Sequence, residues 1–213
     1  MDYYFPIFFL FVIFLAWFAV KRAQATKAEK NAKDLFWQRE SEANTIRRKS
    51  LDDIEYVKIP NYLLLPELSS LVPADDPELA RCNDIMRNLM DKRILNLTGK
   101  TSTDLKFMYG AANLSALDEY DTNFTLLAQT VYAYGDRLHQ LGFDTEAITV
   151  LRFGIDILSD ISGNYKLLAS LYAKYNQHSK IEELKVAAEK LDSLMKPSIL
   201  RTLEELSQPP SIQ

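Results

Sequence analysis

The sequence predicts an all-α protein with a single transmembrane helix at its N-terminus, and three observations lead to this fold class. Residues 3–20 form a run of 18 residues without a charged side chain. Residues 79–206 carry apolar side chains at the three- and four-residue spacing that is typical of amphipathic helices. Within that part of the chain, a two-helix pattern recurs. We therefore expect a membrane anchor followed by a stack of antiparallel helix pairs.

The N-terminal run is long enough to cross a membrane. At about 1.5 Å per residue, a helix over this run nearly spans a hydrocarbon core of roughly 30 Å. Tyr3, Tyr4 and Trp17 lie near its two ends, where aromatic side chains favour the membrane interface. Residues 1–20 are therefore predicted to be a transmembrane anchor.

The charges that flank this run predict its orientation. Only Asp2 precedes it, whereas residues 21–50 hold nine Lys or Arg and four Asp or Glu. An excess of basic residues marks the cytoplasmic side of a span. We expect a single-pass protein of the cell membrane, with its N-terminus outside and its C-terminal domain in the cytoplasm. The alternative is an exported helical domain, because Ala23-Gln24-Ala25 resembles a signal-peptide cleavage site.

Two segments are predicted between the anchor and the main domain. Residues 21–50 form a basic helical stalk, because residues 21–44 are rich in helix-forming Ala, Lys, Glu and Gln and contain no Gly or Pro. Residues 51–77 form an irregular connector with four prolines, in which Ile54, Tyr56 and Ile59 alternate like a short strand. The leucines of this connector are too numerous for a free linker, so we expect part of it to be buried against the helical domain.

The main domain is predicted to cover residues 78–206, and the last residues, 207–213, are predicted to be a disordered tail. The first helix of the domain begins at Pro77, and Cys82 falls on its apolar face. We therefore expect Cys82 to pack as a buried, unreactive side chain. Further helices are expected over residues 105–117, 121–141, 145–158, 165–172, 181–191 and 198–206.

The composition argues against several functional classes. Cys82, His139 and His178 are the only cysteine and histidines, so no zinc site is available, and no carboxylates follow a calcium-loop pattern. We predict no metal, no cofactor and no small-molecule substrate. The chain carries none of the short motifs that mark nucleophilic, metal-dependent or nucleotide-binding enzymes, and its paired carboxylates are sequence neighbours that do not face one another on a helix. We therefore do not expect an enzyme.

The charge of the domain also argues against nucleic acid as a partner. Residues 51–213 hold 16 basic and 24 acidic side chains, a net charge of −8. Phosphate recognition needs the opposite sign. An acidic domain beside a basic stalk favours protein partners, and the alternative is that this charge balance only keeps the domain soluble.

The C-terminal half contains a repeat of 34 residues. Five pairs of positions share this offset and similar side chains: Val131 and Tyr165, Gly135 and Ala169, Leu138 and Tyr172, Ala147 and Ile181, Gly154 and Ala188. Arrays of such units need about three repeats and a cap to bury enough surface. The helices at residues 79–95, 105–117 and 198–206 are expected to complete the stack.

With this period and its small residues, the segment from Ala128 to Pro197 resembles the tetratricopeptide repeat (TPR) family. The positions that carry the resemblance are Gly135, Ala147, Gly154, Ala169, Ala188 and Pro197. It covers a third of the chain, and the sequence departs from the family's pattern at Ile181, at Lys185 and at Pro197, which stands one residue late. The whole chain also has the look of a bacterial membrane protein. An unrelated helical bundle with an accidental period remains the alternative.

The resemblance implies a peptide-binding groove lined by the first helix of each unit. By the family's positions, the groove residues are Gln129, Tyr132, Asp136 and His139 in the first unit and Lys166, Ser170 and Lys174 in the second. Otherwise they are the polar faces of solvated helices. We thus expect a membrane-anchored scaffold or adaptor for an unidentified protein, and the alternative is a permanent accessory subunit of a larger membrane complex.

Overall fold

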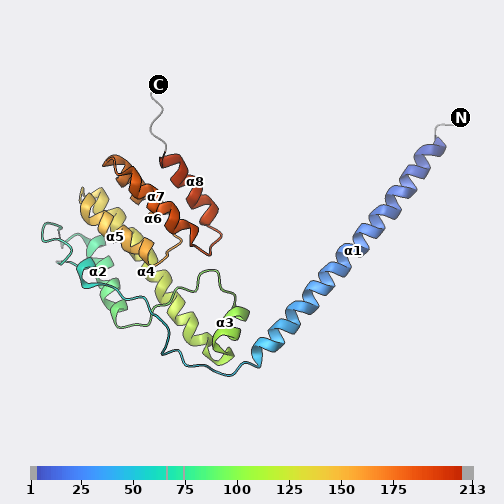
Figure 1. Ribbon diagram of the computed structural model, residues 1–213, viewed down its shortest axis with the longest axis horizontal. Helices are drawn as coiled ribbons and strands as arrows, with labels where there is room; N and C mark the ends of the chain where they lie inside the picture. Colours follow the sequence, from blue (N-terminus) through green and yellow to red (C-terminus); the bar gives the residue numbers. More distant parts are fainter. Residues whose placement is uncertain (1–3, 66, 74, 208–213) are drawn as a thin grey trace. The chain divides into compact units, whose positions relative to one another are not determined.

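The computed structural model describes residues 4–65, 67–73 and 75–207, and the regular structure in them consists of eight α-helices and two short 3-10 helices (Figure 1). The predicted all-α fold is confirmed. The chain divides into two compact units, one made of residues 1–49 and 101–113 and the other of residues 50–100 and 114–213. The predicted disordered tail lies outside the described residues except for Ser207.

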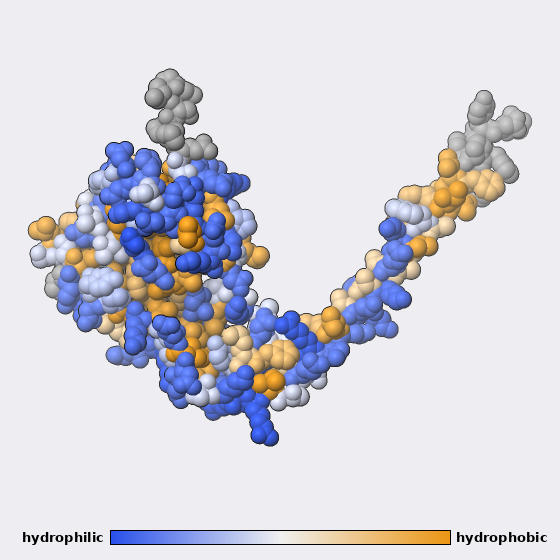
Figure 2. All heavy atoms as spheres, viewed as in Figure 1, coloured by the Kyte–Doolittle hydropathy of each residue, from blue (hydrophilic) through white to orange (hydrophobic). Residues whose placement is uncertain are grey.

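The first unit is built on one long helix, α1, which runs without a break from Tyr4 to Asn44. It is long and apolar enough to cross a membrane, and its most apolar window is not buried by the rest of the described chain. Figure 2 shows hydrophobic residues gathered near its N-terminal end and hydrophilic residues further along. The described residues therefore contain one candidate membrane span, within Phe9–Asn44 and near the N-terminus, and the same helix covers most of the residues of the predicted stalk.

The C-terminal end of α1 packs against α3, a short helix from Ser102 to Tyr109. Ala43 is fully buried at this contact, and Glu40 accepts hydrogen bonds from Thr103, at 2.7 Å, and from Lys106. A capping box between Thr101 and Asp104 begins α3. Gly110 follows the helix with φ +88°, a conformation that ends it and that favours glycine. Gly110 also lies so close to the backbone of Arg47 that there is no room for a side chain. The predicted helix over residues 105–117 is thus divided at Gly110.

The second unit is a set of packed helices, of which α4 to α8 are joined by short loops (Figure 1). In chain order these helices are α2 (Pro77–Met90), α4 (Leu114–Gln140), α5 (Asp144–Asp156), α6 (Ser162–Lys174), α7 (His178–Glu189) and α8 (Lys196–Ser207). Each of α5, α6 and α7 packs against the helix that follows it, α4 packs on α5, and α8 also contacts α6.

The 34-residue offset recurs in the positions of these helices. Helices α5 and α7 begin at Asp144 and His178, and helices α6 and α8 begin at Ser162 and Lys196. Equivalent side chains are buried in the alternate helices α4, α6 and α8, as Val131, Tyr165 and Ile199 show. Helix α8 therefore occupies the position that the first helix of a third two-helix unit would have.

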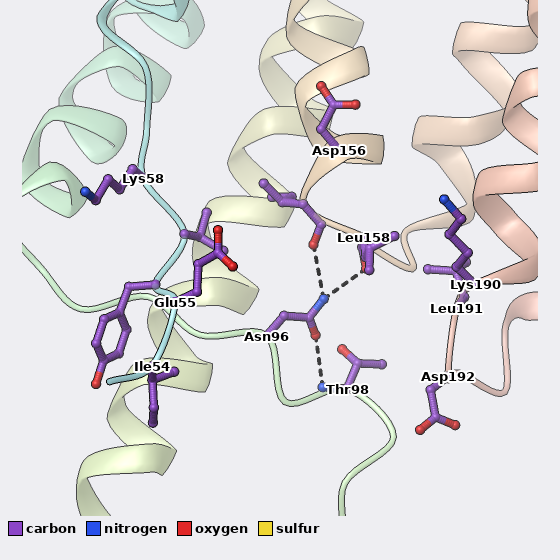
Figure 3. A pocket seen from close by; sticks show the side chains of 13 residues that line it. Ile54, Glu55, Lys58, Asn96, Thr98, Asp156, Leu158, Lys190, Leu191 and Asp192 are labelled. Atoms are coloured by element: carbon purple, nitrogen blue, oxygen red, sulfur yellow. Dashed lines mark hydrogen bonds between the residues drawn. The ribbon is translucent and has the colours of Figure 1, made fainter. Parts of the chain in front are cut away.

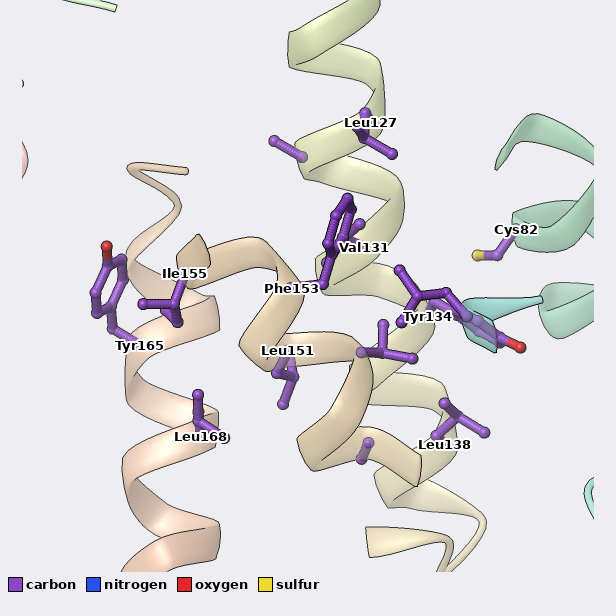
Figure 4. Packing of buried hydrophobic residues seen from close by; sticks show 14 of the residues in the cluster. Cys82, Leu127, Val131, Tyr134, Leu138, Leu151, Phe153, Ile155, Tyr165 and Leu168 are labelled. Carbon is purple, nitrogen blue, oxygen red and sulfur yellow. The ribbon is translucent and has the colours of Figure 1, made fainter. Parts of the chain in front are cut away.

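The core of this unit lies between the helices of the series, and Figure 4 shows part of it. Leu127, Val131 and Leu138 of α4 are buried together with Leu151 of α5. Gly135 allows this close packing, because a Cβ atom at Gly135 would come within 2.6 Å of the Leu151 side chain.

The connector is fixed to α2 rather than free. Leu63, Leu64 and Leu65 are buried, the backbone N–H of Leu65 donates to Asn83 Oδ1 at 2.8 Å, and Arg87 donates to the Leu65 carbonyl at 2.5 Å. Residues 54–59, predicted to be strand-like, do not form a β-strand. Their backbone makes a single hydrogen bond to another described backbone group, from Val57 N to Ile94 O at 2.9 Å.

Candidate protein-binding surface

The residues predicted to line a groove lie on two neighbouring helices, and all are at least partly exposed. Helix α4 carries Gln129, Tyr132, Asp136 and His139, and helix α6 carries Lys166, Ser170 and Lys174. Helices α4 and α6 contact each other, and α5 lies between them in the chain. The structure thus places the two sets side by side.

A buried carboxylate brings two of these residues together. Asp144, at the first turn of α5, has a side chain that is 7% exposed. Its Oδ1 lies 2.6 Å from His139 Nδ1, and its Oδ2 accepts hydrogen bonds from Lys174 Nζ at 2.5 Å and from the Tyr175 hydroxyl at 2.7 Å. Through Asp144 of α5, His139 of α4 and Lys174 of α6 therefore link three helices. Both side chains already have a hydrogen-bond partner within the protein.

The ionisation of Asp144 follows from this environment. Burial is the largest single influence and raises its pKa, because it disfavours a charge. The hydrogen bonds from Lys174, His139 and Tyr175 together outweigh burial and lower the pKa to about 2. Asp144 is thus a carboxylate at neutral pH, and sequence reasoning missed it because its partners come from two other helices.

The other predicted groove residues differ in how far they are free to bind a partner. The Tyr132 ring lies over the Gly163 backbone, where a Cβ atom would come within 2.6 Å of the ring. Asp136 accepts a hydrogen bond from Gln140 at 2.8 Å. Gln129 and Lys166 are exposed, and their side chains make no hydrogen bond or ion pair within the described part of the chain.

Helix α2 adds a wall that the sequence did not predict. Tyr132 and Asp136 line a hollow of about 360 Å³ together with Glu78, Arg81 and Cys82 of α2. Cys82 is only 6% exposed, and burial raises the pKa of its thiol, in agreement with the predicted structural role.

An ion pair holds α2 against α4 at this place. Asp76 caps α2 by accepting from the backbone N–H groups of Glu78 and Leu79, at 3.1 and 3.0 Å. Its carboxylate also receives Arg137 of α4, at 2.6 Å. The Arg137 hydrogen bond is the main reason why the pKa of Asp76 is lowered. The sequence signal for the cap was Asp76 before Pro77, but nothing in the sequence pointed to Arg137.

A larger pocket, of about 800 Å³, opens elsewhere in the same unit (Figure 3). It is lined by residues 54–58 of the connector, by Asn96 and Thr98, and by the residues at the ends of α5 and α7, 156–158 and 190–192. Sequence reasoning missed this pocket, because its walls come from four segments that are distant in the chain.

Over residues 4–65, 67–73 and 75–207, no three His, Cys, Asp or Glu side chains gather in a way that would hold a metal ion. The chain matches no protein-family model, and comparisons with curated proteins and with solved structures also found no match. The fold therefore assigns the protein only to a broad class, that of all-α proteins, and its described residues contain one candidate membrane span.

Proposed function

We propose that this protein is a membrane-anchored scaffold or adaptor, which binds a protein partner on the exposed face of its TPR-like helices. The observation that carries the proposal is the 34-residue series of α4, α6 and α8, in which equivalent residues are buried and polar side chains stay exposed. A stack of this kind presents one continuous face to a partner. Among the predicted groove residues, Gln129 and Lys166 are exposed and their side chains make no hydrogen bond or ion pair within the described chain.

The orientation is part of the same proposal. Nine basic residues follow the candidate span within residues 21–50, and none precedes it. This asymmetry favours a cytoplasmic location for the helical domain. The partner is then a cytoplasmic protein, or the cytoplasmic part of a membrane protein.

Site-specific photocrosslinking in living cells tests the binding face. A photoreactive amino acid at Lys166 is expected to form a discrete adduct with one protein, whereas the same amino acid at Lys92, an exposed position outside the series, is not. Lys166→Glu should reduce recovery of that protein on the purified full chain, and Lys92→Glu should not. Equal adducts from both positions would contradict the proposed face.

Purification without crosslinking distinguishes an adaptor from an accessory subunit, once the adduct has identified the partner. An adaptor releases its partner during purification in detergent, because its interface forms and dissociates. A permanent subunit co-purifies with its complex in fixed proportion and loses solubility when the complex is removed.

Protease accessibility of a C-terminal tag tests the orientation. Protection in intact cells with cleavage in inside-out vesicles is expected for a cytoplasmic domain. Cleavage in intact cells, or recovery of a soluble fragment that lacks the N-terminal span, would favour the exported alternative.

A further inference from the structure

A basic hollow lies on the surface of α1, directly after the apolar part of the helix. It is lined by three small side chains and three long cationic ones: Ala19, Ala23 and Thr26, and Arg22, Lys27 and Lys30. All six residues are exposed, and all belong to the first unit. The basic hollow is therefore formed by α1 alone and is separate from the exposed face of α4 and α6.

The basic hollow begins where the candidate span ends. The apolar run ends at Val20, and Trp17 lies just before this end, where aromatic side chains favour the membrane interface. At about 1.5 Å per residue along a helix, Arg22 lies about 3 Å beyond Val20 and Lys30 about 15 Å beyond it. The headgroup layer adds roughly 5 to 8 Å to each side of the hydrocarbon core, and charges attract over about 8 Å more at physiological salt. The whole hollow is thus within reach of lipid headgroups.

The cationic side chains of the hollow also lean towards the span. Each Cα–Cβ bond of an α-helix is tilted towards the N-terminus of the helix. The apolar run forms the N-terminal part of α1, so the side chains of Lys27 and Lys30 are directed back towards it. Their flexible four-carbon stems bring the ammonium groups closer to the headgroups than the backbone positions are.

The three cations have no anionic partner in the described part of the chain. Their side chains make no ion pair and no hydrogen bond there. Glu29 and Asp34, which lie in the same stretch of α1, do not line the hollow. Arg39, further from the span, is by contrast paired with Asp104 at 2.7 Å. The positive charge next to the span is therefore available to an anion from outside the chain.

The small residues of the hollow indicate the shape of the ligand. Ala19 belongs to the apolar run, and Ala23 lies one turn further along the same face. These short side chains leave room between the cations for a phosphate group and for the first part of an acyl chain. The Thr26 hydroxyl donates to the carbonyl oxygen of Arg22 at 3.0 Å, so the donors left for a ligand are the three cations. A ligand that fits combines an anionic group with an apolar part.

We propose that the basic hollow binds an anionic phospholipid of the membrane that α1 enters, with the phosphate among the three cations and the top of an acyl chain against Ala19. Charge-assisted hydrogen bonds from arginine and lysine are the usual means of binding phosphate. Each basic side chain near an anionic surface strengthens binding by about fivefold, so the three together favour an anionic headgroup over a zwitterionic one. This site rests on the proposed membrane anchor and adds the class of lipid that the anchor selects.

Native mass spectrometry of the full chain tests the proposal. The chain is reconstituted in nanodiscs that contain equal amounts of phosphatidylcholine and phosphatidylglycerol with the same acyl chains, and the lipids retained on the released protein are counted. The wild-type chain should retain phosphatidylglycerol at least about tenfold more often than phosphatidylcholine. A triple variant with Arg22→Gln, Lys27→Gln and Lys30→Gln should lose this preference.

A second pair of variants separates this site from a general attraction of basic residues to the membrane. Ala23→Leu keeps every charge but fills the hollow, so it should lower the preference for phosphatidylglycerol about fivefold, as for the loss of one cation. Ala25→Leu is the matched control, because Ala25 lies at nearly the same depth and two residues turn a helix by about 200°. It should leave the preference unchanged. If Ala23→Leu also left it unchanged, general electrostatic attraction would explain the lipid preference and the proposed site would be refuted.

Two further results would overturn the proposal. Equal retention of the two lipids by the wild-type chain would show that the hollow does not select an anionic headgroup. Displacement of phosphatidylglycerol by excess inorganic phosphate would show that the hollow binds free phosphate without an apolar contact. Either result leaves the membrane anchor intact, whereas a wild-type chain that does not enter nanodiscs would refute the anchor and this site together.

Discussion

Gly99 lies against the backbone of Asp192, so close that a Cβ atom on Gly99 would overlap the carbonyl oxygen and the carboxylate of Asp192. Gly99 also has φ +82°, which favours glycine. The neighbouring Lys100 forms an ion pair with the same aspartate at 3.1 Å. This contact fastens the segment that follows α2 to the end of α7.

Replacement of Gly99 by alanine is therefore expected to destabilise the second unit. We expect Gly99→Ala to lower the free energy of unfolding by about 3 kcal/mol, because left-handed strain and overlap with Asp192 act together. Chemical denaturation of the full chain in detergent measures this change. Gly142→Ala is the matched control, since Gly142 has φ +86° but no atom within 4 Å of its Cβ position. It should cost about 1 kcal/mol. If both variants lost the same free energy of unfolding, the close approach of Gly99 to Asp192 would not contribute to stability.

The contact between Gly135 and Leu151 predicts a second effect. Gly135→Ala improves helix propensity by about 1 kcal/mol, but its methyl group meets the fully buried Leu151 and overpacking costs about 1 to 3 kcal/mol. We therefore expect Gly135→Ala to lower the free energy of unfolding by about 1 kcal/mol. Leu151→Ala removes the side-chain atoms that the new methyl group would meet, so the double variant should be more stable than the sum of the two single changes predicts. Strict additivity in thermal unfolding would argue against a direct contact.

The sequence predicted those parts of the fold that depend on local pattern. The long apolar N-terminal helix, the amphipathic helices and the small residues Gly135 and Gly154 could be found because each leaves a signal in neighbouring or regularly spaced residues. The structure places both glycines where a Cβ atom would crowd the next helix, against Leu151 and Asn164 respectively.

The parts that the sequence did not predict depend on contacts between distant segments. Asp144 draws His139 and Lys174 into one cluster, and Asn96 holds the end of α5, although no spacing in the chain relates these residues. The alternation of Ile54, Tyr56 and Ile59 predicted a strand, but only Val57 is paired through its backbone N–H. The periodicity also could not show that Gly110 divides two helices, because that depends on the approach of Arg47.

The two buried tyrosines Tyr134 and Tyr165 are expected to respond differently to loss of the hydroxyl group. The Tyr134 hydroxyl lies 3.4 Å from Asn83 Nδ2, whereas the buried Tyr165 hydroxyl has no hydrogen-bond partner among the described residues. Tyr165→Phe should therefore raise the free energy of unfolding by up to about 1 kcal/mol, because it removes an unsatisfied buried group. Tyr134→Phe should lower it by roughly 0.5 kcal/mol. The opposite order in denaturant titrations would refute this assignment.

The same two phenols predict the behaviour of the protein at alkaline pH. Burial raises the pKa of Tyr134 and of Tyr165 to about 12, from an ordinary value of 10.0. A raised pKa contributes stability that is fully present below pH 10 and is lost as the pH rises towards 12. Ultraviolet titration should show these two phenols ionising in a late phase, as the second unit unfolds. Each Phe variant should remove one phenol from the late phase.

Asp144 predicts how the second unit responds to acid. Its pKa of about 2 lies below the ordinary value of 3.8, because hydrogen bonds from Lys174, His139 and Tyr175 outweigh the opposing effect of burial. A lowered pKa contributes stability that is present above pH 4 and is lost as the pH falls towards 2. At neutral pH, Asp144→Asn should lower the free energy of unfolding by roughly 2 kcal/mol, the value expected for hydrogen bonds to a charged group.

The acid limb of the stability profile distinguishes this role from a general effect of charge. The difference between the wild-type chain and Asp144→Asn should shrink as the pH falls from 4 and nearly disappear at pH 2, where Asp144 is half protonated and most of its contribution is gone. Asp156→Asn removes an exposed carboxylate that makes no ion pair with a described residue, so it should change the profile little. A pH-independent difference for Asp144→Asn would mean that the amide disturbs packing and that the charge of Asp144 does not hold α4, α5 and α6 together.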